Sequence, residues 1–208
     1  MKIGIIGSGN IGGTLTRRFR ELGHDVTVAN SRGPDSLASL SAETGAQAAT
    51  AEQAAADGDV VVIAVPLRAV PELPADALRG KVVIDANNYY PQRDGHVEEI
   101  DDKSLTSSRW TAELLPGANV VKAFNTIEAT HLLSLGRPAG DDGRIALPIA
   151  GDDPQAKQTV QRLVDELGFD AVDAGTLDES WRQQPGTPVY GADRDASGVR
   201  RGLTSVRP

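Results

Sequence analysis

Near its N-terminus the chain contains a short apolar segment that leads directly into a glycine-rich turn. Gly7, Gly9 and Gly12 have the spacing G-x-G-x-x-G, and the apolar residues 3–6 before them predict a β-strand. In this motif the first glycine makes the tight turn, the second lets backbone N–H groups approach a pyrophosphate, and the third lets the next helix pack closely on the strand. The segment therefore predicts the first βα unit of a dinucleotide-binding fold.

The residues that follow the turn have the periodicity of a helix. Ile11, Leu15, Phe19 and Leu22 recur at helical spacing. The N-terminus of such a helix presents unpaired N–H groups and the positive end of its dipole to a phosphate. The alternative is a glycine-rich turn with a purely structural role. We expect the cofactor to contact the whole turn, that is Gly7, Ser8, Gly9, Asn10, Ile11 and Gly12.

The second predicted strand, residues 26–29, ends in Asn30, Ser31 and Arg32. This is where a dinucleotide-binding fold reads the ribose, about 20 residues beyond the glycine turn, and an NAD-binding chain usually has Asp or Glu there. The amide, hydroxyl and guanidinium groups found here are donors for a 2′-phosphate, and no carboxylate among the three repels it. The turn therefore predicts NADP(H) as cofactor. The alternative for Arg32 is an ordinary solvated charge.

Strand and helix patterns alternate along the rest of the chain. Residues 59–65, 82–86 and 120–124 are apolar runs typical of parallel strands buried on both faces. The alternation predicts an α/β fold with a doubly wound, mostly parallel sheet of the Rossmann type. In the segment 145–150, Pro148 lacks an N–H group, so we expect this strand near a sheet edge. Residues 1–175 would form the NADP-binding domain, followed by a polar, weakly packed C-terminal arm, 176–208.

Polar side chains follow three of the predicted strands, and ligands of doubly wound sheets bind at the carboxyl ends of the strands. Asparagines also occur in ordinary turns, which is the alternative for those found here. Among these residues the expected cofactor contacts are Val65, Pro66, Asn87, Ala123 and Asn125, and the candidates for the substrate side are Asn88, Lys122 and Thr126.

The arm contains Trp181, one of two tryptophans in a chain with 4% aromatic residues. A tryptophan in a polar segment is expected to cover something. One hypothesis is that Trp181 anchors the arm near the substrate pocket and helps to exclude water. The other is that it seals the end of the last strand.

The composition excludes several classes of function. A net charge of −8 argues against general affinity for nucleic acid or anionic membranes. The chain has no cysteine and three histidines, which argues against disulfides, thiol chemistry and a metal site. No run approaches the roughly 18 apolar residues of a membrane span. We expect a cytoplasmic protein without a metal.

Several motifs in this order resemble the family of coenzyme F420-dependent NADP oxidoreductases. They are the segments 7–12, 30–32, 64–66, 122–127, 150–153 and 173–175, within residues 1–178. The resemblance implies a small Rossmann protein in which NADPH lies along the strand ends with its nicotinamide facing the deazaflavin ring. It also implies that Ser31 and Arg32 hold the 2′-phosphate and that subunits pair as a homodimer. Some members carry an apolar C-terminal helix, from which the polar, proline-interrupted segment 178–208 departs.

The expected function is an NADPH-dependent oxidoreductase that transfers a hydride between NADP(H) and a flat acceptor, coenzyme F420 by resemblance. The cofactor carries this chemistry and the protein mainly orients two rings, so the sequence identifies no catalytic residue. Within the enzyme class, the alternative acceptors are a flavin or a small carbonyl compound. Outside it, the alternative is a non-catalytic NADP-binding redox sensor, because a cofactor site does not imply turnover.

Overall fold

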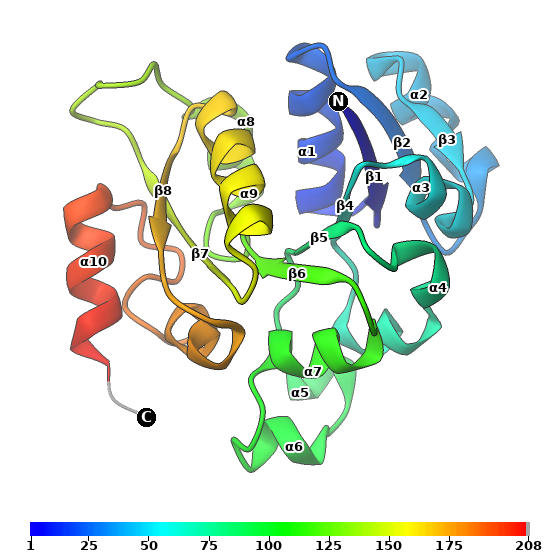
Figure 1. The fold of residues 1–208 in the computed structure, drawn as a ribbon. Helices are drawn as coiled ribbons and strands as arrows, with labels where there is room; N and C mark the ends of the chain where they lie inside the picture. The colour runs from blue at the N-terminus through cyan, green and yellow to red at the C-terminus, as the bar shows by residue number, and fades with distance from the viewer. Residues whose placement is uncertain (207–208) are drawn as a thin grey trace.

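The computed structural model describes residues 1–206, which form an eight-stranded sheet in the order β3-β2-β1-β4-β5-β6-β7-β8 (Figure 1). All neighbouring strands are parallel except β6 and β7, which are antiparallel. The predicted α/β fold with a doubly wound, mostly parallel sheet is therefore confirmed. The strands are β1 (Lys2–Ile6), β2 (Asp25–Ala29), β3 (Gln47–Ala49), β4 (Val60–Ile63), β5 (Val82–Asp85), β6 (Asn119–Lys122), β7 (Ala146–Gly151) and β8 (Asp170–Asp173).

Helices connect the strands, and short 3-10 helices, labelled η, precede or extend some of them. The α-helices are α1 (Asn10–Glu21), α2 (Ala38–Thr44), α3 (Ala51–Asp57), α4 (Ala75–Leu78), α5 (Pro91–Asp94), α6 (Glu98–Asp101), α7 (Ser107–Leu114), α8 (Ala129–Ser134), α9 (Pro154–Glu166) and α10 (Ala196–Ser205). The 3-10 helices are η1 (Pro34–Leu37), η2 (Leu67–Glu72) and η3 (Leu177–Gln183).

The helices cover both faces of the sheet, and each face has its own apolar core. Helices α1, α8 and α9 pack on one face, while α3, α4 and α7 pack on the other. Strand β4 supplies both cores, because Val60 and Val62 point to the first and Val61 and Ile63 to the second. This explains why β4 reads as a continuous apolar run rather than an alternating one.

Local sequence signals set several element boundaries. Gly45 ends α2 in the left-handed conformation, with φ of 72°. Thr50 and Gln53 form the capping box that begins α3. Strand β3 was not predicted from the sequence. It has three residues, too few to show a periodicity, and it lies between the stop and start signals of two helices.

The strand that contains Pro148 lies near the sheet edge, as expected, although it is the last strand but one and not the edge strand itself. β7 lies between β6 and β8. Its pairing with β6 is limited to Gly151 with Val121 and Ala150 with Lys122. Pro148 lies beyond this short ladder, where the missing N–H costs no hydrogen bond between strands. Its carbonyl accepts a hydrogen bond from the arm instead.

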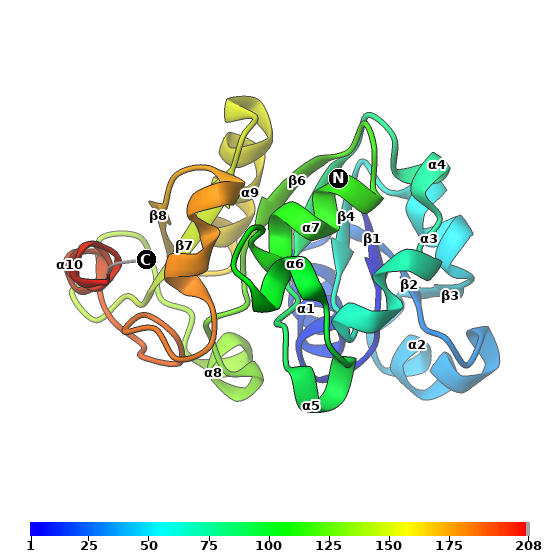
Figure 2. The same cartoon turned by 90° about the horizontal axis from the view of Figure 1, so that it is seen from below.

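Residues 176–206 of the C-terminal arm are folded, which corrects the expectation of weak packing; residues 207–208 of the predicted arm lie outside the described part of the chain. The arm contains η3 and α10, and the polar sequence of α10 conceals two apolar residues, Val199 and Leu203, that are buried against β7 and β8. Figures 1 and 2 both show α10 at the end of the molecule opposite β3. The arm thereby covers the face of β7 and β8 that α9 leaves open.

Candidate functional site

The glycine turn joins β1 to α1, and each glycine has a separate spatial reason. Gly7 has φ of 111°, and an added Cβ there would lie 2.1 Å from the Ala64 carbonyl oxygen. A Cβ at Gly12 would lie 1.8 Å from the Gly7 carbonyl oxygen. A Cβ at Gly9, in contrast, would meet no atom within 4 Å. Gly7 and Gly12 are therefore required by packing, while Gly9 leaves space open on the outside of the turn.

The N-terminus of α1 faces that open space. Gly9 is its N-cap, no side chain caps the first N–H groups, and the first turn contains no acidic residue. Unpaired N–H groups and the positive end of the helix dipole therefore remain available to an anion. The geometry is that of a phosphate cradle.

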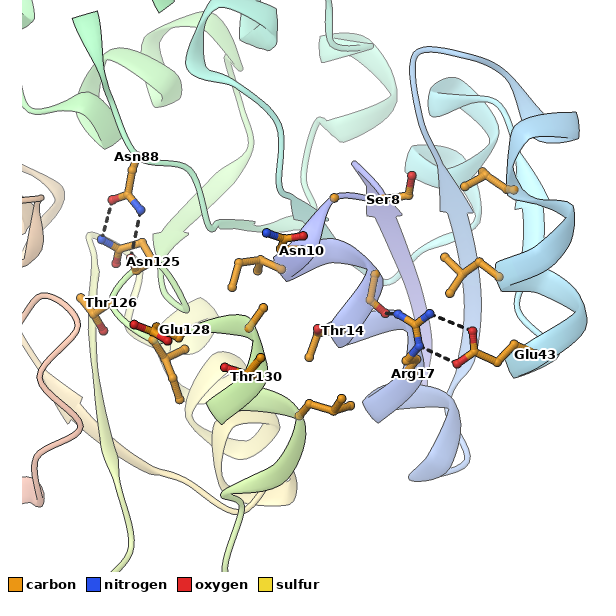
Figure 3. Close-up of a pocket in the computed structure, with 18 of the residues that line it drawn as sticks. Ser8, Asn10, Thr14, Arg17, Glu43, Asn88, Asn125, Thr126, Glu128 and Thr130 are labelled. Carbon is orange, nitrogen blue, oxygen red and sulfur yellow. Dashed lines mark hydrogen bonds and ion pairs between the residues drawn. The ribbon is translucent and has the colours of Figure 1, made fainter. Parts of the chain in front are cut away.

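A cavity of about 990 Å³ begins at the glycine turn and extends along α1 to α8. Figure 3 shows Asn88 and Asn125 at one end of it and Arg17 and Glu43 at the other. Predicted site residues in its lining are Ser8, Gly9, Asn10, Ile11, Arg32, Asn88, Asn125 and Thr126. Lining residues that the sequence analysis missed include Thr14, Arg17, Ser36, Ser39, Glu43, Glu128, Thr130, Tyr190 and Gly191.

The turn after β2 is held by the side chain of Asn30. Its Nδ2 donates to the Ser8 hydroxyl at 3.0 Å, and its Oδ1 accepts from the Arg32 backbone N–H at 2.9 Å and from the Ser36 hydroxyl at 3.0 Å. These bonds tie this turn to the glycine turn. The Ser31 and Arg32 side chains are exposed, and Arg32 lines the cavity. Asn30 thus shapes the turn, and Arg32 offers a cation to a ligand.

A second arginine lies at the same end of the cavity. The Arg17 guanidinium on α1 donates to both carboxylate oxygens of Glu43 on α2, at 2.6 and 2.8 Å. The bond from Arg17 lowers the pKa of the Glu43 carboxyl, so Glu43 is a charged partner of Arg17. No sequence pattern reveals such a pair, because the two residues belong to different helices.

Two asparagines at the opposite end bind each other. Asn125 Nδ2 donates to Asn88 Oδ1 at 3.1 Å, and Asn88 Nδ2 donates to the Asn125 carbonyl at 3.0 Å. Phe124, just before, has φ of 62°, which is uncommon for a residue other than glycine. This reversal ends β6 at Lys122 and turns Asn125 toward the Asn88 loop. The sequence suggested both asparagines but not their contact.

Some predicted contacts lie beside the cavity rather than in its lining. Asn87 Oδ1 accepts from the Val65 N–H at 2.8 Å, which joins the ends of β4 and β5. Asn87 is 3% exposed, and within the described residues its Nδ2 has no hydrogen-bond partner. Pro66 and Ala123 are also absent from the lining of this cavity. The unpaired Asn87 amide is a donor that a bound ligand could satisfy.

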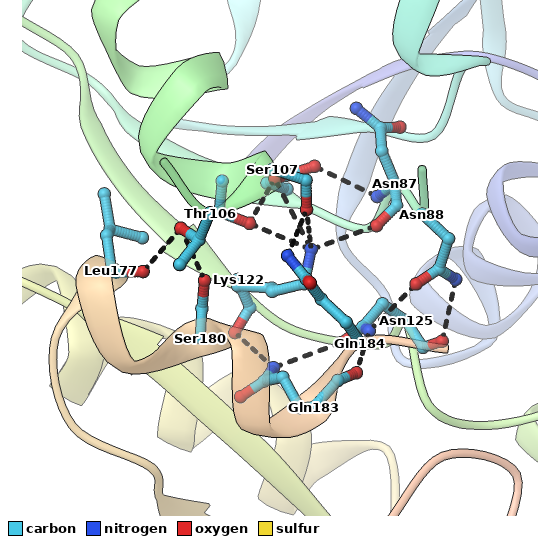
Figure 4. A network of polar contacts seen from close by, with 12 residues as sticks. Asn87, Asn88, Thr106, Ser107, Lys122, Asn125, Leu177, Ser180, Gln183 and Gln184 are labelled. Carbon is cyan, nitrogen blue, oxygen red and sulfur yellow. Dashed lines mark hydrogen bonds and ion pairs between the residues drawn. The ribbon is translucent and has the colours of Figure 1, made fainter. Parts of the chain in front are cut away.

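Lys122 lies fully buried beneath the site (Figure 4). Its Nζ donates to the Asn87 carbonyl at 3.1 Å and to the Ser108 hydroxyl at 2.9 Å, and it lies 3.8 Å from Asp85 Oδ2. Ser108 in turn donates to Asp85 at 2.6 Å. Burial lowers the pKa of the Lys122 ammonium, and the Asp85 carboxylate opposes that shift. Lys122 therefore connects β5, β6 and α7 and does not line the cavity.

The arm reaches the asparagine end of the cavity. The Gln183 carbonyl accepts from Asn125 Nδ2 at 2.7 Å, and the Gly191 N–H donates to the Thr126 carbonyl at 2.8 Å. The Tyr190 hydroxyl is 2.5 Å from that of Tyr90. These residues were missed because the arm showed no apolar pattern strong enough to predict that it packs against the strand ends.

Trp181 does not line this cavity. It borders a second cavity of about 510 Å³, between the arm and the loop that precedes α7. The lining of this second cavity comprises Ile100, Lys103, Ser104, Leu105, Thr106, Asp178, Trp181, Gln184, Pro185, Gly186, Thr187 and Val206. Trp181 therefore lies away from the first cavity, and because the lining of the second cavity includes no residue of β8, this lining does not place Trp181 at the end of the last strand either.

Residues 1–206 contain neither a candidate membrane span nor a candidate metal site. No helix in this range combines the length and apolar character needed to cross a membrane. Nor does this part of the chain gather three or more His, Cys, Asp or Glu side chains that could hold a metal ion.

Comparison with known proteins assigns the family. Residues 2–89 match the family model described as NADP oxidoreductase, coenzyme F420-dependent. The chain is 30% identical to the F420-dependent NADP reductase of Methanothermobacter thermautotrophicus over 206 residues, covering 91% of this chain and 87% of that protein. It is 33% identical to rat metalloreductase STEAP3 over 178 residues, covering 85% of this chain but only 34% of that protein.

A solved structure agrees over nearly the whole chain. A hypothetical protein from Sinorhizobium meliloti superimposes with a TM-score of 0.79 at 34% identity, covering 93% of this chain and 94% of that one. The shared fold therefore includes the region of the arm as well as the glycine turn. With this fold, the family-model match and the methanogen relative, the chain belongs to the family of coenzyme F420-dependent NADP oxidoreductases.

Proposed function

We propose that this protein is an NADPH-dependent reductase whose hydride acceptor is coenzyme F420. One observation carries the proposal: a single cavity joins a phosphate cradle at Gly9 and an exposed cation at Arg32 to an amide-lined end at Asn88 and Asn125. Its volume of about 990 Å³ lies in the range of cofactor pockets. When bound, NADPH supplies the hydride, and the chain holds and orients it.

Each end of the cavity has a separate part in this proposal. The N–H groups at the start of α1 would hold the pyrophosphate, and Arg32 with Ser31 would hold the 2′-phosphate. The nicotinamide would then lie toward the ends of β4, β5 and β6, where the unpaired Asn87 amide faces no protein partner within residues 1–206. Asn88, Asn125 and Thr126 would border the acceptor.

The acceptor is inferred from the relatives together with the shape of the site. The methanogen relative, of which this chain covers 87%, is named an F420-dependent NADP reductase. The rat relative is named a metalloreductase, but this chain spans only a third of its length. A metal ion takes single electrons, whereas a nicotinamide gives a hydride, so a flavin is the alternative direct acceptor that this relative suggests.

We also propose that two copies associate and that the protein acts in the cytoplasm. The family resemblance implies the pairing, and two leucines at the end of α8, Leu133 and Leu135, are 41% and 37% exposed. The absence of cysteine suits a compartment in which disulfides do not form. Light scattering after gel filtration would measure the mass, and a monomer at all concentrations would contradict the pairing.

The decisive experiment mixes the purified protein and NADPH with coenzyme F420, FMN, FAD or a small aldehyde. We expect the absorbance of reduced nicotinamide to fall fastest with coenzyme F420. The Gly9→Val variant serves as a control, because it should block the cradle without disturbing the fold. If NADPH binds tightly and no acceptor oxidises it, the protein is a sensor and the proposed activity is wrong.

A further inference from the structure

Tyr190, a residue of the arm, lines the end of the cavity that contains Asn88 and Asn125. Contacts of the residues that follow it in the chain fix its position. Gly191 donates from its N–H to the Thr126 carbonyl at 2.8 Å. Three residues later the Arg194 carbonyl accepts from the Ala146 N–H at 2.8 Å, and Asp193 pairs with His131 of α8. Tyr190 therefore does not belong to a loose loop. It lines the cavity beside Gly191, at the end where the proposed acceptor would lie.

The Tyr190 hydroxyl has a partner from the other side of the site. It lies 2.5 Å from the Tyr90 hydroxyl, and Tyr90 is two residues beyond Asn88. The Arg93 guanidinium lies 5.0 Å from the centre of the Tyr90 ring and donates to the Asn88 carbonyl at 2.6 Å. The arm and the Asn88 loop thus meet through two phenols whose positions are set by independent contacts.

A hydride acceptor of this kind needs a proton as well as a hydride. Among the lining residues, the ionisable side chains at the nucleotide end are Arg17, Arg32 and Glu43, and those at the other end are Glu128 and Tyr190. Glu128 is exposed at the start of α8. Tyr190 is partly buried and bonded to a second hydroxyl that can restore its proton. It is the better-placed donor.

We propose that Tyr190 is the proton donor of the reaction, an inference that rests on the proposed function. The nicotinamide C–H bond breaks and its electron pair goes with the hydride to a ring carbon of the acceptor. The ring nitrogen conjugated with that carbon takes the proton from the Tyr190 O–H. Tyr90 then returns a proton to Tyr190 and regains one from water, so NADPH is oxidised by two electrons and the acceptor reduced by two.

The ionisation of Tyr190 agrees with this role. Burial and, to a smaller extent, the hydrogen bond with Tyr90 together raise the pKa of Tyr190 to about 12, while the Arg93 charge opposes the shift. The other titratable groups on the elements around it include Asp94, which pairs with Arg93, the His131 and Asp193 pair, and Glu128. Tyr190 therefore carries its proton throughout the neutral range and loses it only as the pH rises through about 12.

The test is the Tyr190→Phe variant, assayed with NADPH and coenzyme F420. We expect the rate of hydride transfer in a single turnover to fall by about 10²-fold or more, the usual contribution of a positioned general acid, with an unchanged Kd for NADPH. Added imidazolium or phosphate buffer should restore part of the rate in the variant and not in the wild type. Tyr89→Phe is the matched control, because the Tyr89 hydroxyl binds Gly95 and Asp101 outside the cavity.

The Tyr90→Phe variant gives a second, independent measurement. It keeps the Tyr190 hydroxyl but removes the group that restores its proton after each transfer, so we expect the single-turnover rate to stay near that of the wild type and the steady-state rate to fall, with part of it restored by buffer. Wild-type rates in both variants, or a raised KM for the acceptor with an unchanged single-turnover rate in Tyr190→Phe, would overturn the inference. A wild-type protein that reduces no acceptor would instead refute the proposed function itself.

Discussion

Asn125 and Gln183 exchange hydrogen bonds in both directions. The Asn125 side-chain amide donates to the Gln183 carbonyl at 2.7 Å, and the Gln183 side-chain amide donates to Asn125 Oδ1 at 3.1 Å. Both side chains are buried, and Gln183 also donates to the Pro148 carbonyl at 3.3 Å. Asn125, which borders the cavity after β6, is therefore positioned by Gln183, the last residue of η3.

The Gln183→Leu variant tests this connection. It should lower the free energy of unfolding by about 1–3 kcal/mol, because it leaves Asn125 Oδ1 and the Pro148 carbonyl buried without a donor. Urea unfolding would measure the loss. Gln158→Leu, at an exposed position of α9, is the matched control and should change stability by less than about 0.5 kcal/mol. Equal effects of the two changes would contradict the argument.

Arg32→Ala tests the cofactor preference. It should weaken NADPH binding by about 1.5–3 kcal/mol, the range for hydrogen bonds to charged groups, and leave NADH binding nearly unchanged. Calorimetric titration with both nucleotides would show the difference. Arg162→Ala, on the exposed side of α9, controls for the loss of one positive charge. A similar loss for NADPH and NADH would remove Arg32 from the 2′-phosphate site.

Two glycine substitutions should separate binding from folding. Gly9→Val should abolish NADPH binding and keep the melting temperature, because its side chain meets no protein atom and enters the space proposed for the pyrophosphate. Gly12→Ala should lower the melting temperature, because its Cβ would collide with the Gly7 carbonyl. Thermal melts without ligand and titrations with NADPH measure both. Normal NADPH binding by Gly9→Val would refute the cradle.

Lys122→Met tests the buried network under the site. Removing one partner of a buried charge pair leaves the other uncompensated, so we expect a loss of about 3–5 kcal/mol in the free energy of unfolding. Adding Asp85→Asn to this variant should recover part of the loss, and the four proteins form a double-mutant cycle. If the two changes were simply additive, Lys122 and Asp85 would not be coupled across their 3.8 Å separation.

Trp181→Ala distinguishes the two hypotheses for this residue. Because Trp181 borders the second cavity, we expect a lower stability, by about 0.5–3 kcal/mol, and unchanged kinetics with NADPH and its acceptor. Truncation of the whole arm is a poorer test, since it also removes Tyr190 and uncovers Val172 in β8. A raised KM for the acceptor would place Trp181 in the acceptor site after all.

The sequence predicted the features that depend on near neighbours. The glycine turn and the capping box of Thr50 are each encoded within a few residues, and the structure contains both helix starts. The family assignment supports NADP(H) as the cofactor, while the roles of the individual site residues remain predictions. The sequence could not predict that the Lys122 side chain points into the interior. The direction of a side chain at a strand end depends on the elements that pack around it. The same applies to Tyr190, whose partner is 100 positions away.

The antiparallel step from β6 to β7 also determines when the site is completed during synthesis. Since β8 is parallel to β7, the chain leaves the sheet at Gly175, beside Gly151. It then returns along η3 before Gly191 reaches Thr126 and Tyr190 reaches Tyr90. Chains are made from the N-terminus, and domains fold as they emerge. A nascent chain therefore acquires the glycine turn of the phosphate cradle with its first strands. Tyr190 and Gly191, which line the acceptor end of the cavity, are added much later. The ability to hold the nucleotide precedes the ability to use it.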